Sequence, residues 1–175
     1  QHHVTVRLVD LRLINGAPPK SAVGGNGNAG ANGGAVYMYC FNTAGHCWLE
    51  LERAAIAHCR VYATGSGTSE VYALGGAAYV YSPNGGIKLD QSIVHNNTAT
   101  ASYTGSDNVQ AYAEGGGCSL VGVNSALTAT DSTISSNIAT CANPAWNTYA
   151  QGGGVHSFSD STVTLTRTLL DNNQA

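Results

Sequence analysis

The chain has 175 residues, of which only 10% are charged, against about 25% in a typical soluble domain. Its formal net charge is -3, and it contains seven lysine and arginine residues. This balance makes nucleic acid and anionic membrane surfaces poor partners. No apolar run approaches the length of about 18 residues needed to span a bilayer, so we expect no membrane insertion. The length predicts one domain over residues 1–175.

Two sequence blocks alternate along the chain. The first begins with paired glycines and recurs at 33–39, 75–81, 115–121 and 152–158. The second recurs at 6–18, 49–61, 87–99, 127–139 and 163–175. Its pattern is apolar-x-apolar-x-x-x-x-apolar-x-x-Asn-x-small. The second glycines of the first block are 42, 40 and 37 residues apart, and such a period indicates a repeat architecture.

Within both blocks, apolar residues stand two apart with polar residues between them, which is the period of a half-buried strand. The matched columns favour an all-β solenoid over a sandwich of hairpins, because hairpins need no residue type to recur every 40 positions. We expect about five coils of roughly 36–42 residues, beginning near 4, 33, 75, 115 and 152. Each coil should contain about three short strands. Residues 98–110 and 140–148 are predicted as loops of variable length, and 18–32 as a mobile glycine-rich loop.

Charged residues fall in columns that test this register. Six positions before the asparagine of the second block, the residues are Asp10, Arg53, Gln91, Asp131 and Arg167. Coils about 4.8 Å apart would place Asp10 beside Arg53 and Asp131 beside Arg167. In a neighbouring column, Glu50 would lie between Arg7 and Lys88. These two columns place opposite charges on adjacent coils, which supports the predicted stacking.

The asparagine column itself contains Asn97, Asn137 and Asn173, preceded by Gly16 and Cys59. Stacked amides at one turn can bond to each other and to turn backbone, so a structural ladder is predicted. The alternative is that asparagine merely tolerates the backbone conformation of the turn. Asn96 begins the sequon Asn96-Asn97-Thr98 and should point outward, so it is the predicted glycosylation site if a eukaryotic cell secretes the protein.

Five cysteines without CxxC spacing indicate an oxidising, extracellular or cell-surface location with one or two disulfides. Cys40–Cys47 is the first candidate pair because these residues bracket a short loop, and Cys118–Cys141 is the second. Cys59 should be unpaired. The alternatives are buried thiols or a zinc site formed by Cys40, His46, Cys47, His58 and Cys59, whose spacing matches no standard finger. We therefore predict no metal and no cofactor.

The two blocks resemble the GGA[ILV] and FxxN repeats of polymorphic outer-membrane proteins and related surface proteins. The first motif corresponds to Gly33-Gly34-Ala35-Val36 and Gly75-Gly76-Ala77-Ala78, and the second to 94–97, 134–137 and 170–173, with an aliphatic residue in place of phenylalanine. The resemblance covers nearly the whole chain through short motifs. It implies a right-handed parallel β-helix with an adhesive or structural role at the cell surface.

Three functions are compared. The first is a glycosylated subunit that stacks head to tail into a fibre or coat. It is suggested by both ends of the sequence, which lie on second-block copies without a polar cap. The second is an adhesin or glycan-binding module that uses tyrosines such as Tyr37, Tyr39, Tyr79 and Tyr81. The third is a polysaccharide lyase or hydrolase, for which Glu50 and Glu52 are the best carboxylate pair. The dispersed acids favour a protein that is not an enzyme.

Overall fold

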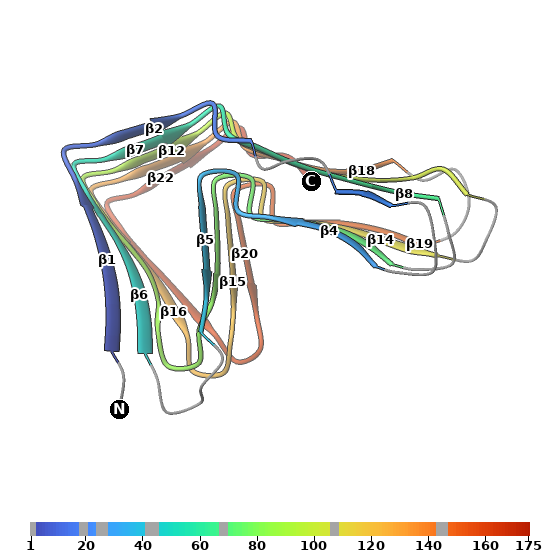
Figure 1. Ribbon diagram of the computed structural model, residues 1–175. Helices are drawn as coiled ribbons and strands as arrows, with labels where there is room; N and C mark the ends of the chain where they lie inside the picture. The colour runs from blue at the N-terminus through green and yellow to red at the C-terminus, as the bar shows by residue number, and fades with distance from the viewer. Residues whose placement is uncertain are drawn as a thin grey trace.

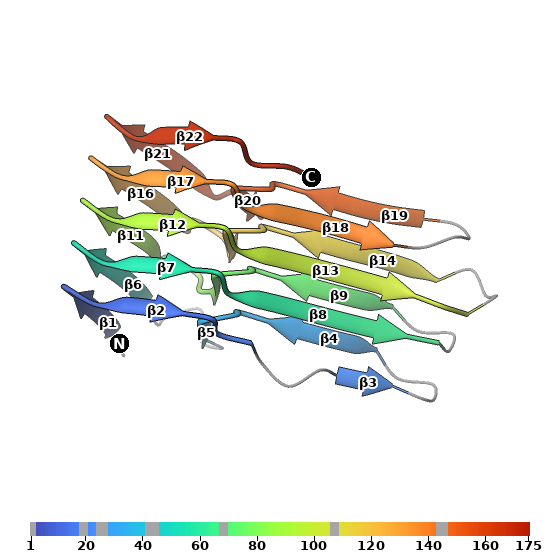
Figure 2. The same cartoon turned by 90° about the horizontal axis from the view of Figure 1, so that it is seen from above.

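The computed structural model describes residues 3–17, 21–23, 28–40, 46–66, 70–105, 109–142 and 147–175. All regular structure in these residues is β-strand. The strands stack in parallel as a β-solenoid, which Figure 1 shows along the coil axis and Figure 2 from the side. With the N-terminal coil nearest the viewer, the chain runs clockwise as it recedes, so the solenoid is right-handed.

Five parallel sheets make up the solenoid, and we call them A to E in the order in which the chain first enters them. Sheet A contains β1 (His3–Val9), β6 (His46–Glu52), β11 (Gly86–Asp90), β16 (Ala126–Thr130) and β21 (Thr162–Thr166). Sheet B contains β2 (Arg12–Ile14), β7 (Ala55–Ala57), β12 (Ile93–His95), β17 (Thr133–Ser135) and β22 (Leu169–Asp171).

The other three sheets have four strands each. Sheet C contains β3 (Ser21–Val23), β8 (Arg60–Gly65), β13 (Thr98–Tyr103) and β18 (Ile138–Ala142). Sheet D contains β4 (Ala29–Asn32), β9 (Val71–Leu74), β14 (Gln110–Glu114) and β19 (Asn147–Gln151). Sheet E contains β5 (Val36–Tyr39), β10 (Ala78–Tyr81), β15 (Cys118–Val121) and β20 (Val155–Phe158).

The solenoid completes about four turns rather than the five coils expected, because only sheets A and B receive a fifth strand. Each full turn also holds five strands rather than three. The segments predicted as variable loops are instead partly strands: β13 lies within 98–110, β18 and β19 overlap 140–148, and β3 and β4 lie within 18–32. The buried positions of β4, β13, β14 and β18 are mostly alanine. Alanine has a low preference for strands, so the sequence pattern there was weak.

Two separate cores fill the cross-section. Sheets A, B and E enclose a triangular lobe that contains larger aliphatic residues such as Leu49, Ile87 and Leu127. Sheets C and D form a thin two-layer lobe in which small side chains such as Ala101 and Ala113 meet. The small residues allow the two sheets to approach closely, so the second lobe is flat.

The predicted register is confirmed in sheets A, B and E, whose strands are formed by the two repeated blocks. Val6, Leu49, Ile87, Leu127 and Val163 are consecutive register partners in sheet A. The interior members of this column are fully buried. Each inward apolar side chain therefore packs on its equivalents in the coils above and below, which is the packing expected of a solenoid.

Candidate functional site

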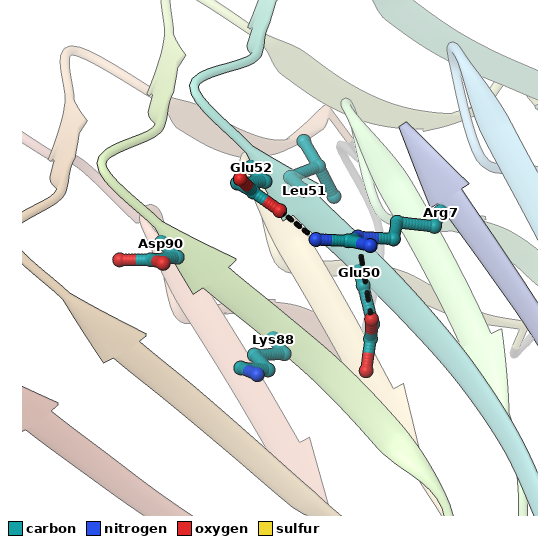
Figure 3. A pocket seen from close by; sticks show the side chains of 6 residues that line it. All are labelled: Arg7, Glu50, Leu51, Glu52, Lys88 and Asp90. Carbon is teal, nitrogen blue, oxygen red and sulfur yellow. Dashed lines mark hydrogen bonds and ion pairs between the residues drawn. The ribbon is translucent and has the colours of Figure 1, made fainter. Parts of the chain in front are cut away.

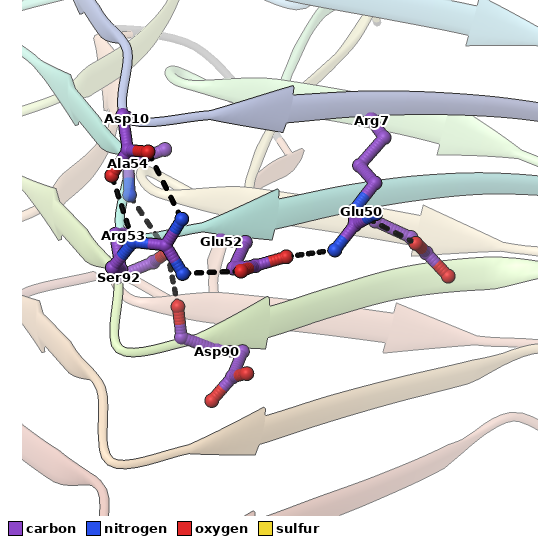
Figure 4. A network of polar contacts seen from close by, with 8 residues as sticks. All are labelled: Arg7, Asp10, Glu50, Glu52, Arg53, Ala54, Asp90 and Ser92. Atoms are coloured by element: carbon purple, nitrogen blue, oxygen red, sulfur yellow. Dashed lines mark hydrogen bonds and ion pairs between the residues drawn. The ribbon is translucent and has the colours of Figure 1, made fainter.

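The outward face of sheet A carries the main group of charged side chains (Figures 3 and 4). Arg7 on β1 lies between the two carboxylates of β6: its Nε is 4.0 Å from Glu50, and its Nη2 bonds to Glu52. Lys88 is the register partner of Glu50 on the other side. The structure thus places Glu50 between the two cations, at the positions that the columns predict.

A second arginine completes this network at the corner between sheets A and B. Arg53 donates to Asp10 at 2.8 and 2.9 Å and also bonds to Glu52 (Figure 4). The hydrogen bond from Arg53 lowers the pKa of Asp10, and the hydrogen bond from Arg7, followed by that from Arg53, lowers the pKa of Glu52. Both carboxylates are therefore held ionised by guanidinium partners.

One charge relation was not anticipated from the sequence. Glu52 and Asp90 are register partners on adjacent strands, so two acids face each other in the outermost column of sheet A. The two arginines that bond to Glu52 offset this repulsion. This column can be read from the sequence, because Glu52 and Asp90 stand two residues after the register partners Glu50 and Lys88.

The other predicted ion pair lies at the opposite end of the solenoid. Arg167 donates to the two carboxylate oxygens of Asp131 at 2.5 and 2.7 Å. This bidentate contact lowers the pKa of Asp131. Asp10, Arg53, Asp131 and Arg167 therefore form two pairs in one column, with Gln91 between them.

The hollow within the charged group on sheet A offers little space for a substrate. The hollow bounded by Arg7, Glu50, Glu52, Lys88 and Asp90 has a volume of about 30 Å³, close to that of one water molecule (Figure 3). A polysaccharide-cleaving site needs an open cleft with a proton-donating and a proton-accepting group. Here the candidate carboxylates Glu50 and Glu52 are instead occupied by cations of the neighbouring strands.

The three asparagines form a continuous ladder at the corner between sheets B and C, in which Asn97 and Asn137 are buried and Asn173 is half-buried. Asn97 donates from its backbone and its amide to Asn137 Oδ1, at 3.1 and 2.9 Å, and Asn137 donates likewise to Asn173 Oδ1, at 3.1 and 3.0 Å. Each amide also donates to a carbonyl of the preceding coil, such as Ile56 O from Asn97 and Val94 O from Asn137. The ladder thus pairs turn backbone that has no strand partner.

A shorter ladder at the corner between sheets A and B was missed. Ser92 accepts from Ala54 N at 3.1 Å, and Ser132 accepts from Ser92 N at 3.1 Å. The signal was present, because Ser92 and Ser132 are 40 residues apart and occupy equivalent places in the repeat.

The predicted glycosylation site, Asn96, lies at an exposed corner directly before the buried Asn97. Its backbone has φ of 54°, and its amide contacts His95 Nδ1 at 2.8 Å. Equivalent corners in the other coils have positive φ at Asn15, His58, Ser136 and Asn172. The Asn96 side chain is therefore accessible.

The cysteines divide into one disulfide and three free thiols. Cys40 and Cys47 are bonded and join the end of β5 to β6. The second predicted pair, Cys118–Cys141, is wrong, because Cys118 is buried in the triangular lobe and Cys141 packs against the flat lobe. Burial raises the pKa of Cys118 to about 12. Cys59 is also free and buried, and its sulfur accepts from Gly16 N at 3.3 Å.

The residues of the alternative zinc site do not form a ligand set. The disulfide uses Cys40 and Cys47, His46 bonds to Asn84 O at 2.7 Å, and His58 packs edge-on against His95. In the described part of the chain, no group of three or more His, Cys, Asp or Glu side chains is arranged to hold a metal. The residues that the structure describes also contain no helix that is long and apolar enough to span a bilayer.

Three pairs of tyrosines stack along the coil axis. Tyr37 stacks on Tyr79 with ring centroids 5.7 Å apart, Tyr39 stacks on Tyr81 at 4.7 Å, and Tyr112 stacks on Tyr149 at 5.1 Å. In such a stack the ring faces cover each other and mainly the edges meet solvent. A glycan that binds by lying on a ring face would find that face only where a stack ends or is interrupted.

A polar pair not identified from the sequence lies at the bend between sheets D and E. His156 Nδ1 is 3.2 Å from a carboxylate oxygen of Glu114, and its Nε2 is 3.2 Å from Gln151 Oε1. The neighbouring Ser119 is fully buried. The His156 and Glu114 side chains are 10% and 20% exposed, whereas Gln151 is exposed.

No protein-family model, no curated protein and no solved structure matches this chain.

Proposed function

We propose that the protein is a structural β-solenoid subunit of the extracellular space or the cell surface that assembles end to end into a fibre or coat. The observation that carries this proposal is the exposure of core columns at both ends of the solenoid. Leu49, in the interior of a sheet A column, is 0% exposed, whereas Val6 and Val163 of the same column are 38% and 41% exposed. Covering these apolar side chains would stabilise an assembly.

The contact is formed when β21 and β22 of one copy pair with β1 and β2 of the next. Val163 then continues onto Val6 of the next copy, and Leu165 onto Leu8. The charge column continues as well, because Arg167 meets Asp10 of the next copy and the order acid–base–acid–base is kept. Apolar and electrostatic complementarity thus favour the same register.

Further features support an extracellular or surface location. The Cys40–Cys47 disulfide is typical of oxidising compartments, and the exposed corner at Asn96 suits a covalent glycan. The resemblance to polymorphic outer-membrane-protein repeats supports the same location. A mass decrease on N-glycosidase treatment of native protein, absent in Asn96→Gln, would establish the glycan.

The assembly is tested by electron microscopy and light scattering of the native polypeptide. We expect filaments, and we expect Leu165→Glu to convert them to monomers because it places a charge in the contact. The matched control is Thr148→Glu, which adds the same charge to an exposed edge residue of sheet D. Monodisperse wild-type monomers would overturn the proposal, since they would show that other parts of the same polypeptide cover the ends.

The paired carboxylates on sheet A support a structural role over catalysis. Each of Asp10, Glu52 and Asp131 bonds to arginine, and the space among Glu50, Glu52 and Asp90 is about 30 Å³. Turnover of an acidic polysaccharide by purified protein, abolished by Glu52→Gln, would contradict this conclusion.

A further inference from the structure

The aromatic column on the outward face of sheet E is interrupted at one position. Tyr39, Tyr81, Val121 and Phe158 are consecutive register partners on β5, β10, β15 and β20. Tyr39 covers one face of the Tyr81 ring, with centroids 4.7 Å apart and an angle of 21° between the planes. The other face of Tyr81 is directed along the column toward Val121, whose side chain is much smaller than an aromatic ring.

A hollow of about 340 Å³ lies at this interruption. It is lined by Tyr81 and Val121 of the sheet and by the turns that follow them, including Pro83 and Val123. Its volume lies within the range of small-ligand sites, about 300–1,000 Å³, and most of its lining is apolar. Phe158, which is 61% exposed, is the next ring in the column beyond Val121.

The spacing of the two rings sets what can enter. Tyr81 and Phe158 lie two strands apart, so a ring-shaped group above Val121 would lie about 4.8 Å from each. That separation is within the range of aromatic contacts, about 4.5–7 Å. The Tyr81 ring therefore lines the hollow on one side, and the Phe158 ring, which does not line it, is the next aromatic side chain in the column beyond Val121.

The rim is polar and uncharged. The amide of Asn124 donates to Asn84 Oδ1 at 3.3 Å, and Asn84 and Ser159 line the opening. Among the described residues that line the hollow, none is a carboxylate or a basic side chain. A pyranose ring offers C–H groups to aromatic faces and hydroxyls to amides and serine, without charge. An acidic sugar would find no cation here.

We propose that this hollow binds one pyranose unit of a neutral polysaccharide, with the sugar ring between Tyr81 and Phe158 and its hydroxyls directed to the amide rim. The site lies on the side of the solenoid, away from the strand edges β1 and β21. It is therefore independent of the end-to-end contact, and either can fail without the other.

The test measures binding of cellohexaose, laminarihexaose and chitohexaose by isothermal titration calorimetry and by NMR shifts of the Val121 and Val123 methyl groups. We expect at least one of these neutral oligosaccharides to bind and to shift both valines. Val121→Tyr should complete the aromatic column and weaken binding by about tenfold or more while preserving the fold.

Phe158→Ala provides a second variant whose fold is not at risk, because this side chain is largely exposed, and it should also weaken binding by about tenfold. Tyr62→Ala, on sheet C, is the matched control and should leave binding unchanged. Absence of binding by all three probes, selective binding of indole or of a galacturonate hexamer, or full binding by Val121→Tyr would each overturn the proposal.

Discussion

At the scale of single residues, the corners of the solenoid require particular residue types, which therefore recur in the sequence. Non-glycine residues with positive φ form three columns, which contain Asp131, Asn96 and Asn124 respectively. Polar residues tolerate this conformation better than β-branched ones. Directly beside these exposed corners lie the buried Asn and Ser ladders. Corners in the interior coils thus combine an exposed polar residue, such as Gln91 or Asn96, with a buried side chain that pairs the turn backbone, such as Ser92 or Asn97.

The asparagine ladder should be sensitive to the loss of its central member. Asn137 is 0% exposed and accepts two hydrogen bonds from Asn97. Asn137→Ala leaves these donors unpaired in the core, so we expect the free energy of unfolding to fall by about 3 kcal/mol in urea titration. Asn172→Ser is the control, because Ser136 occupies the equivalent corner, and it should have little effect. Equal stability of the two variants would contradict the structural role of the ladder.

The paired carboxylates predict how stability depends on pH. The pKa values of Asp10, Glu52 and Asp131 are lowered in the folded protein by arginine. The ionised carboxylates therefore add to the free energy of unfolding at pH values above the ordinary carboxyl pKa of about 4. This stabilisation is lost as the pH falls through their lower pKa values in the folded protein. We expect the melting temperature to decrease from pH 6 to pH 2.

Arg53→Gln isolates this contribution, because Gln91 shows that the corner accepts glutamine. The variant should melt below the wild type at pH 6 and together with it at pH 2, where the carboxyls are protonated in both. A constant difference at all pH values would indicate that Arg53 acts through packing rather than charge.

At the scale of elements, the paired glycines are the joint between sheets D and E. Gly75 has φ of 66°, which favours glycine, and a Cβ on Gly76 would overlap the carbonyl oxygen of Gly116 in the next coil. The first glycine thus permits the bend, and the second permits close approach of adjacent coils. The same two roles recur in every copy of the first block, so the motif is structural.

Gly76→Ala should therefore disrupt packing between coils even though alanine is small. We expect it to lower the free energy of unfolding by about 3 kcal/mol, because the atoms it meets are backbone and move together with the sheet. Lys88→Ala, at an exposed position, is the control for the introduced residue. Wild-type stability of Gly76→Ala in thermal and urea unfolding would show that the coils can separate without cost.

At the scale of the whole molecule, two lobes of different thickness share one coil axis. The triangular lobe carries the exposed end columns, the charged face and the disulfide, whereas the flat lobe consists mainly of alanine layers. Function is thus expected on the triangular lobe, at its ends for assembly and on its sheet E face for a saccharide. The flat lobe widens the solenoid, but its core consists mainly of smaller side chains than the core of the triangular lobe.

The disulfide links this architecture to an oxidising environment. Cys40 and Cys47 close a short loop between sheets E and A. The bond reduces the conformational entropy of the unfolded chain and thereby stabilises the folded protein by about 2 kcal/mol. Treatment with a reducing agent should therefore lower the melting temperature, and the double variant Cys40→Ser/Cys47→Ser should no longer respond. If native protein were isolated with both thiols reduced, the extracellular location would be contradicted.

The sequence by itself determined the repeat, the strands of sheets A, B and E, the asparagine ladder positions and the Asp10–Arg53 and Asp131–Arg167 neighbours. These follow from side chains that recur at a fixed period, because stacked coils place equivalent residues about one strand spacing apart. The strands of sheets C and D were not predicted, because alanine layers lack a strong alternating pattern. Only the tertiary structure separated Cys118 from Cys141, brought Glu114 to His156, and showed the interruption at Val121 as a hollow. These features depend on where sheets bend and on what space side chains leave, and a one-dimensional period contains neither.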